Sequence, residues 1–222
     1  MKDVFIEELL NITKKYIWKI QYTTFRRLKR IESRYKSVGN TNNFKGDLGE
    51  EYIIREYLYP SLHNLNCKYD VRRNYTGNRK GNGDTDVRIK INDKTYLGTY
   101  LGEIKNWNEN YDIEDDYFKK LILKPLQTAD KHHKHNWILF IHKKHLKSVR
   151  KLCRIHNITV IPIYLFLDKQ MLKRIEYLFD RTYNSIKNCN ESRWDMNLVL
   201  GTFRPFNRKT CNFSYKENRE KS

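Results

Sequence analysis

Cysteine is scarce in this chain, and so are long apolar runs. None of the four cysteines belongs to a CxxC pair, and their wide spacing fits neither a zinc site nor a disulfide framework: they are Cys67, Cys153, Cys189 and Cys211. The longest apolar run, residues 158–167, has the length of a strand and falls short of the roughly 18 residues that span a bilayer. The N-terminus lacks the unbroken apolar stretch of a signal peptide. We therefore expect a soluble cytoplasmic protein without a membrane partner, in the host cytoplasm if the source is viral.

Positive charge is what the chain has in excess. Lys and Arg number 44 against 26 Asp and Glu, which gives a formal net charge of +18. So large an excess predicts a polyanionic partner, which could be DNA, RNA or an acidic membrane. The absence of a spanning segment makes the membrane the weakest of the three. Frequent Lys, Asn, Ile and Tyr also indicate an AT-rich genome, of viral or other mobile origin.

The hydrophobic periodicity predicts an α/β protein with a mixed central β-sheet flanked by helices and an N-terminal helical extension. Helices are expected over residues 2–37, 45–58, 115–132, 145–156 and 168–180, and strands over 66–75, 87–91, 95–105, 137–141 and 158–167. We expect Pro60 to end the second helix and Pro125 to kink or restart the third. The chain then divides into a basic helical extension (1–40), a core (41–182) and a basic C-terminal extension (183–222).

Two of the predicted strands form a hairpin that carries acids and a base. Side chains alternate faces along a strand, so Glu103 and Lys105, two residues apart, share one face. A four-residue turn would pair Ile91 with Tyr96. Asp86 would then lie diagonally across from Glu103 on the same face, with Cβ atoms about 7 Å apart or less. Two carboxylates at this spacing can bind one cation between them.

A third acid comes from the helix that precedes the hairpin. Glu50, Ile54 and Tyr57 recur at i, i+4 and i+7, so Glu50 points where the apolar face points. Glu51 is instead expected to pair with Arg55 at i, i+4, which is typical of a solvated face. An inward carboxylate is costly unless it is paired or bound to a metal. Glu50 is therefore the better candidate for a site residue.

Three short motifs, taken in order, resemble the PD-(D/E)XK nuclease superfamily. They are KGDLGE at 45–50, TDV at 85–87 and GEIKNW at 102–107, and the resemblance covers roughly residues 44–165. The KGxxxE opening is most like the archaeal Holliday-junction resolvase branch. The ExK element is common by itself, but a preceding Asp on a strand and a Glu on a leading helix make the combination more specific. Thr85 stands where the superfamily usually has Pro.

The resemblance implies a restriction-endonuclease-like core and a metal-dependent DNA endonuclease that hydrolyses phosphodiester bonds. Asp86, Glu103 and the backbone carbonyl of Ile104 would bind Mg²⁺, with Mn²⁺ as a substitute. Glu50 would act through water or hold a second ion. Lys105 would orient the attacking hydroxide and stabilise charge on the phosphorane, with its pKa either lowered by burial or held up by the acids.

The resemblance also implies a further residue and a set of partners. Gln127 matches a Gln that joins the site in several branches, although a plain position on the helix surface fits it equally well. Resolvases of this branch work as dimers that cut two strands symmetrically, so we expect a homodimer acting on branched or duplex DNA. One alternative is a restriction or repair nuclease acting on linear DNA. Another is a nucleic-acid-binding protein whose site no longer cleaves.

Three other features have competing interpretations. The superfamily Asp could be Asp84 or Asp86, and strand parity favours Asp86 while leaving Asp84 in the preceding loop. The KHHKH run at 131–135 lacks Cys partners and fits a solvated helix end better than a zinc site. Tyr75 and Trp107 could stack on bases, but such residues more often serve in packing.

Overall fold

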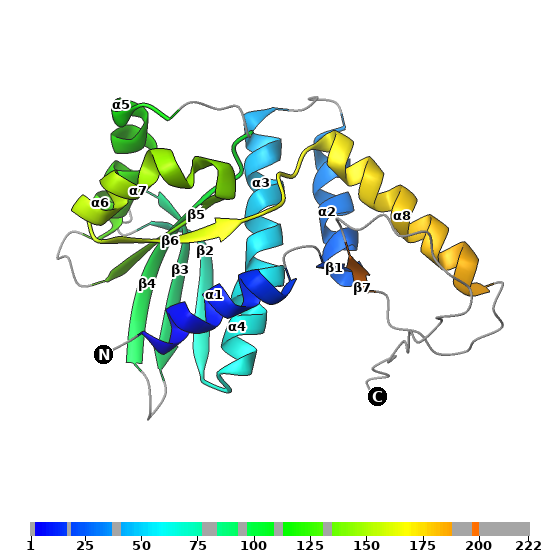
Figure 1. Cartoon of the computed structure of the whole chain (residues 1–222), viewed down its shortest axis with the longest axis horizontal. Helices are drawn as coiled ribbons and strands as arrows, with labels where there is room; N and C mark the ends of the chain where they lie inside the picture. The colour runs from blue at the N-terminus through cyan, green and yellow to red at the C-terminus, as the bar shows by residue number, and fades with distance from the viewer. Residues whose placement is uncertain are drawn as a thin grey trace.

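The protein is an α/β structure with a five-stranded mixed β-sheet flanked by helices (Figure 1). This computed structural model describes residues 3–16, 19–36, 41–76, 84–92, 97–108, 113–130, 135–187 and 197–199. The fold class predicted from the sequence is therefore confirmed. Within these stretches no helix is both long and apolar enough to cross a membrane.

The strands of the main sheet lie side by side in chain order, as β2 (Tyr69–Thr76), β3 (Asp84–Asn92), β4 (Leu97–Lys105), β5 (Asn136–His142) and β6 (Ile158–Ile163). Antiparallel pairing joins β2 to β3 and β3 to β4, whereas β4–β5 and β5–β6 are parallel. The expected meander followed by strand–helix alternation is thus present. The last strand ends at Ile163, earlier than predicted, and residues 164–168 continue without regular structure.

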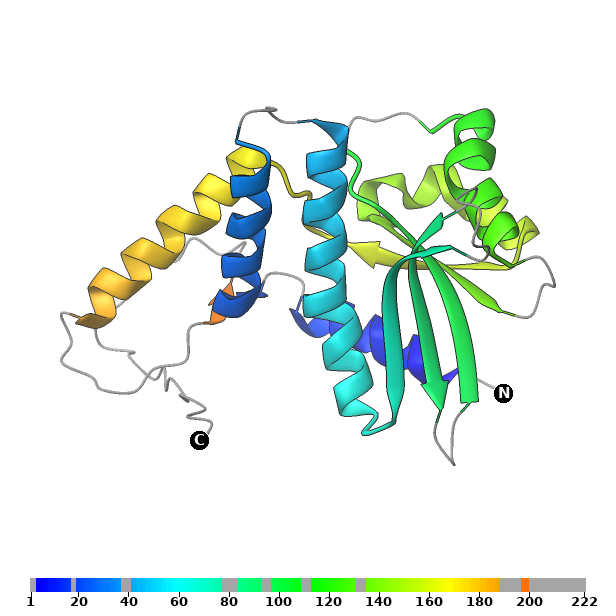
Figure 2. The same ribbon diagram turned by 180° about the vertical axis from the view of Figure 1, so that it is seen from behind.

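Helices cover both faces of this sheet (Figure 2). One face packs on α1 (Val4–Tyr16) and on a continuous helix made of α3 (Asn42–Ile53), the π-helical turn η1 (Ile54–Leu58) and α4 (Tyr59–Asn64). The other face packs on a layer made of α5 (Asp115–Phe118), the π-helical turn η2 (Lys119–Leu123), α6 (Lys124–Ala129), the 3₁₀ turn η3 (Lys143–His145) and α7 (Leu146–Ile155). Along β5, Ile138 and Phe140 enter the first core, and Leu139 and Ile141 enter the second. This alternation explains why residues 137–141 of β5 are all apolar.

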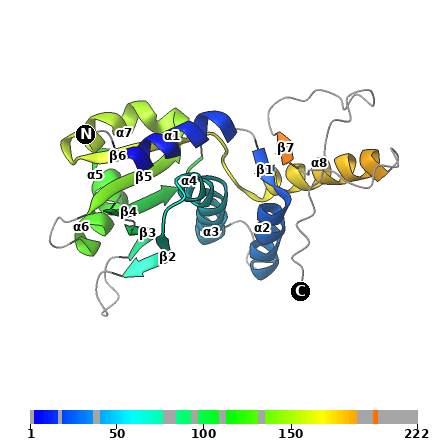
Figure 3. The ribbon, with the colours of Figure 1, turned by 90° about the horizontal axis from the view of Figure 1, so that it is seen from below.

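Two further helices lie on the side of α3 that is away from the sheet: α2 (Tyr22–Arg34) packs on α3, and α8 (Lys169–Lys187) packs on α2 (Figures 1 and 3). The rings of Phe25 and Phe179 lie 4.9 Å apart between them, and Lys29 Nζ lies 3.0 Å from Glu176 Oε2. Beside these helices β1 (Lys19–Gln21) pairs antiparallel with β7 (Asn197–Val199). The sequence did not predict this pair.

The predicted N-terminal extension is built into the core. Phe5 and Leu9 of α1 are fully buried in the same apolar cluster as Phe44 and Leu48 of α3. Residues 1–40 therefore help to hold the helix that carries Glu50. Most of the predicted C-terminal extension, 183–222, lies outside the described residues.

Two prolines lie inside helices, each just after a π-helical turn. Pro60 follows η1, and Pro125 follows η2. A proline lacks a backbone N–H donor and its ring collides with the preceding α-helical turn. A wider π turn relieves that collision and lets the helix continue. The prediction that Pro60 ends its helix is therefore wrong, because the helix runs on to Asn64. Pro125 restarts its helix at α6, which was one of the two predicted outcomes.

Asn106 joins three segments around the end of β4. Its Nδ2 donates to the carbonyl of Lys45 at 2.8 Å and to that of Leu167 at 2.6 Å, and its Oδ1 accepts from the Leu167 N–H at 2.9 Å. Gly49 of α3 lies directly against this side chain, and a Cβ on Gly49 would be 2.5 Å from the Asn106 Cβ. Only glycine allows the helix to approach so closely. The contact fixes α3 against the end of β4.

Replacement of Asn106 should destabilise the fold. In Asn106→Ala the buried Leu167 N–H and two carbonyls lose their partner, so we expect the free energy of unfolding to fall by about 2–4 kcal/mol. Urea denaturation followed by circular dichroism measures this. The matched control is Asn42→Ala, an exposed Asn at the start of α3, for which a change within about 0.5 kcal/mol is expected. Equal effects of the two substitutions would contradict the role of Asn106.

Candidate active site

The register of the β3–β4 hairpin brings Asp86 level with Glu103. The structure pairs Ile91 with Gly98, whereas the sequence predicted a pair of Ile91 with Tyr96. The last pair in this register is Val87 with Gly102, so the next position places Asp86 directly across from Glu103. The sequence had predicted a diagonal position. Because the shift is by two residues, both carboxylates stay on the same face, as predicted.

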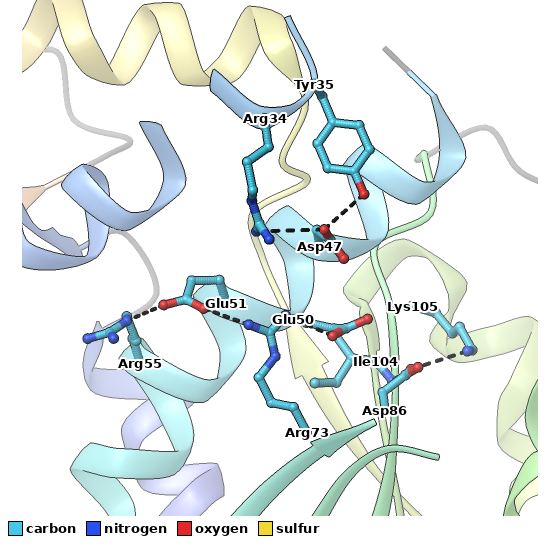
Figure 4. Close-up of polar contacts among 10 residues, drawn as sticks. All are labelled: Arg34, Tyr35, Asp47, Glu50, Glu51, Arg55, Arg73, Asp86, Ile104 and Lys105. Atoms are coloured by element: carbon cyan, nitrogen blue, oxygen red, sulfur yellow. Dashed lines mark hydrogen bonds and ion pairs between the residues drawn. The ribbon is translucent and has the colours of Figure 1, made fainter. Parts of the chain in front are cut away.

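Asp86 is held by the strand beside it (Figure 4). The backbone N–H of Ile104 donates to Asp86 Oδ2 at 2.6 Å, and Lys105 Nζ lies 3.3 Å from the same oxygen. The N–H and C=O of one residue in an extended strand point to the same side. The Ile104 carbonyl is therefore directed toward the Asp86 side of β4. This agrees with its predicted position among the oxygens of the site.

Glu103 is a buried carboxylate with one oxygen paired and one not. Its residue is 1% exposed, and Oε2 lies 2.5 Å from Lys105 Nζ. Among the residues that the structure describes, none makes a hydrogen bond to the buried Oε1. Burial raises the pKa of Glu103 to about 8; the charge of Lys105 lowers it and that of Asp86 raises it. Oε1 is thus a buried oxygen without a described hydrogen-bond donor.

Lys105 carries its positive charge between the two acids. Burial lowers the pKa of Lys105, but the negative charges of Asp86 and Glu103 together outweigh burial and raise it above its ordinary value. Of the two expectations for this lysine, the geometry supports the one in which the acids hold the pKa up. At neutral pH its ammonium group is thus a fixed cation and does not act as a base.

Glu50 reaches the same group from α3. Burial and the negative charge of Asp86 raise its pKa to about 6, although the guanidinium of Arg73 acts to lower it. The Arg73 Nη2 lies 2.9 Å from Glu50 Oε2 (Figure 4). Glu50 is therefore close enough to Asp86 for the two charges to influence each other, as the sequence predicted.

Glu50 and Glu51 are equally buried, contrary to the prediction that only Glu50 points inward. Their side chains are 12% and 13% exposed. Glu51 does pair with Arg55, but it also lies 2.8 Å from Arg73 Nη1. The assignment of Glu51 to a solvated face is thus wrong, because Arg73 of β2 covers both acids. What distinguishes Glu50 is its electrostatic interaction with Asp86.

The remaining predicted residues lie apart from this group or outside the description. Gln127 is exposed on α6, and within the described part of the chain no hydrogen bond joins it to the acids of the site. His135 donates its backbone N–H to the buried Asp130 and pairs with it through the ring, so this end of the KHHKH run is structural; 131–134 are outside the described residues. Trp107 is half-buried against the second core. Asp84 is the first residue of β3 and not a loop residue, contrary to the prediction; its side chain and that of Tyr75 are outside the description.

Two residues near the site were missed by the sequence reasoning. Arg73, on β2, and Asn106, at the end of β4, both bind the helix that carries Glu50. The position of Asn106 directly after the ExK element was an available signal. For Arg73 the only signal was its place on a strand next to β3, which does not identify a partner.

The oxygens of this group suit a hard divalent cation. Across the described ranges, no cluster of three His, Cys, Asp or Glu side chains is arranged to hold a metal by itself. Mg²⁺, however, needs only one or two carboxylates and completes its shell with water and other oxygens. Asp86, the open Oε1 of Glu103 and the carbonyl side of Ile104 supply such a set. The residues present therefore fit the metal that the resemblance implies.

Comparison with known proteins adds no family assignment. The chain matches no protein-family model, no curated protein and no solved structure. The resemblance to PD-(D/E)XK nucleases rests on the motifs and on the geometry described above.

The raised pKa of Glu103 should make the fold less stable as the pH rises. Its pKa is about 8 in the folded chain against an ordinary 4.5, so the stabilisation is complete below about pH 4.5 and is lost as the pH rises through 8. Each pKa unit corresponds to about 1.4 kcal/mol. Glu103→Gln should flatten the fall in unfolding free energy between pH 5 and 8, measured by urea denaturation. The exposed Glu114→Gln serves as control, and an unchanged slope in Glu103→Gln would refute the assignment.

Proposed function

We propose that this protein is a metal-dependent DNA endonuclease that hydrolyses phosphodiester bonds. The observation that supports this most is the buried, half-open carboxylate of Glu103 beside Asp86 and Lys105. A structural ion pair would have both oxygens satisfied, because an unpaired buried polar atom costs roughly 1–3 kcal/mol. An oxygen left open next to a second carboxylate is what a cation-binding site requires.

Asp86, Glu103 and the Ile104 carbonyl would hold Mg²⁺, or Mn²⁺ in its place, with Glu50 acting through water or on a second ion. When bound, such an ion polarises the phosphate and lowers the pKa of a coordinated water. Glu50 is oriented for its role by Arg73, which keeps the side chain beside Asp86. The acids thus provide the charge that a cation needs, on rigid strand and helix positions.

Lys105 would act on the phosphate itself. Its ammonium is held by Asp86 and Glu103 at the end of β4, and its raised pKa keeps it protonated. A fixed cation at this position stabilises the negative charge that accumulates on the phosphoryl oxygens in the transition state. It also orients the attacking water oxygen by hydrogen bonding.

DNA is the substrate that the charge of the protein favours. The net charge of +18 suits a polyanion, and phosphate contacts position a nucleic acid without reading its sequence. Such an interaction fits an enzyme that selects DNA by shape, such as a resolvase of branched DNA, and a homodimer would place two sites on the two strands of a junction. A restriction or repair nuclease on linear DNA would use the same site.

A second candidate function is nucleic-acid binding without cleavage. It is favoured by the existing ion pairs, because Lys105 and Arg73 already neutralise the acids of the site. A site balanced in this way is stable without a metal. The substitutions described next separate the two functions.

Cleavage should depend on the site while binding does not. We expect Asp86→Asn and Lys105→Ala to lower the rate of Mg²⁺-dependent cleavage by about 10²–10³-fold or more, with DNA affinity changed by only a few fold. Gel analysis of nicked plasmid and fluorescence anisotropy measure the two quantities. The exposed Lys119→Ala is the matched control. If the wild-type protein binds DNA yet cleaves none with Mg²⁺ or Mn²⁺, the binding function is correct.

The preference for branched DNA is tested with a four-way junction and a linear duplex of the same sequence. A resolvase should cut the junction at least about tenfold faster, with paired nicks in opposite strands, because each subunit of a dimer contacts one arm. Light scattering of the free protein should then give the mass of a dimer. Equal cutting of both substrates would exclude junction selectivity and favour the restriction or repair type.

A further inference from the structure

Helix α2 carries a row of arginines on its outer face. Arg27, Arg30 and Arg34 recur at i, i+3 and i+7, which places them along one side of the helix. The opposite side is buried against α3 and α8 through Thr24, Phe25, Leu28 and Ile31. Arg26, Arg27, Arg30 and Arg34 are all exposed. The separation of the two sides leaves the basic row directed at solvent.

Most of this row has no acid beside it in the described part of the chain; the exception is Arg34, which lies near Asp47. Within the described part of the chain, no carboxylate lies at ion-pair distance from Arg26, Arg27 or Arg30. Lys29 differs, because it pairs with Glu32 and Glu176 and so serves to hold α2 on α8. Uncompensated cations close together on a rigid helix repel one another. Such a row is stabilised when an anion with regularly spaced charges lies along it.

The arginine row leads to the candidate active site. Arg34, 65% exposed, has its Nη2 3.9 Å from Asp47 Oδ2, and the hydroxyl of Tyr35 donates to the same oxygen at 3.0 Å. Asp47 lies one helical turn before Glu50 on α3, and Figure 4 shows Arg34 directed at Asp47. A hollow of about 240 Å³ at this end of α2 is lined by Glu32, Tyr35, Lys36, Phe44 and Lys169. Arg34 therefore connects the arginine row to the helix that carries Glu50.

We propose that this arginine row is a docking ridge for the sugar–phosphate backbone of duplex DNA next to the cleavage position. The inference rests on the proposed function and extends it, because it assigns the flanking duplex to one helix. From Arg27 to Arg34 the helix rises about 10 Å, which matches about three steps of 3.4 Å along a DNA strand. Arg34 is the end nearest the scissile phosphate, and Arg26 and Arg27 contact the duplex farther away.

The other exposed basic helix, α7, provides a comparison. Lys147, Arg150, Lys151 and Arg154 are also exposed. This helix, however, packs on β6 and α5, in the layer on the opposite face of the sheet from α3. Helix α2 packs on α3, which carries Glu50, whereas the described contacts of α7 include none of this kind. The ridge is therefore assigned to α2, and α7 provides a control with the same change in charge.

The test compares two triple variants of the full chain. One is Arg26→Ala/Arg27→Ala/Arg30→Ala on α2; the other is Lys147→Ala/Arg150→Ala/Arg154→Ala on α7. Binding to a 24-base-pair duplex is measured by fluorescence anisotropy at several salt concentrations, with Ca²⁺ in place of Mg²⁺. We expect the α2 variant to lose affinity roughly tenfold to a hundredfold and its log–log salt slope to flatten by about 0.9 for each lost contact. The α7 variant should change by less than about threefold.

Several outcomes would overturn the docking ridge. These are an equal or larger loss in the α7 variant, wild-type affinity in the α2 variant, and a wild-type protein that does not bind duplex DNA. A larger loss for duplex RNA than for DNA would also overturn it. Thermal unfolding of both variants checks that they fold, which is expected because all six side chains are exposed.

The experiments distinguish a wrong docking-ridge proposal from a wrong nuclease proposal. If the wild-type protein cleaves DNA while the α2 variant binds and cleaves normally, the nuclease stands and the ridge falls. If affinity depends on α2 but no variant and no wild-type protein cleaves, the ridge stands and the nuclease falls.

Discussion

Burial of the Glu103 carboxylate is the constraint on which the site depends. Ionising a carboxyl group that is 1% exposed costs free energy unless a partner of opposite charge lies beside it. Strand alternation provides that partner two residues later as Lys105, on the same face of β4. Asp86 joins them only because the β3–β4 register brings it to the Ile104 N–H. The same register buries Val87 against the core, so the packing of the sheet and the geometry of the site are set together.

The acids of this site have cations beside them before any metal arrives. Lys105 forms ion pairs with Asp86 and Glu103, and Arg73 forms one with Glu50. The chain can therefore fold with the site formed and without the repulsion that bare carboxylates would cause. In the proposed metal site an entering cation would share or replace part of this attraction, so its affinity would be lower than in a site of unpaired acids. Arg26, Arg27 and Arg30 of α2 differ in kind, because they have no described acid to contact and face solvent.

Much of this arrangement could be predicted from the sequence, because a period of two along strands decides which side chains share a face. The shared face of Asp86 and Glu103 was predicted correctly although the pairing of the two strands was wrong by two residues, because a shift of two residues leaves each side chain on the same face. Helical spacing could not separate Glu50 from Glu51, because Arg73, from a strand 22 residues later, covers both. The π turns before Pro60 and Pro125 and the three-residue β1–β7 pair could not be predicted either, since tertiary contacts rather than local periodicity stabilise such short elements.

The hydrogen bonds of Asn106 have a consequence for how the protein acquires its activity. They connect β4 to residues 61 positions earlier and 61 positions later in the chain. Contacts that close loops of this length form late in folding, because their entropic cost is recovered only when the surrounding core is in place. Glu50 and Lys105 therefore meet only once both loops are closed. If the chain is the nuclease proposed above, a nascent or partly folded chain would be inert toward DNA.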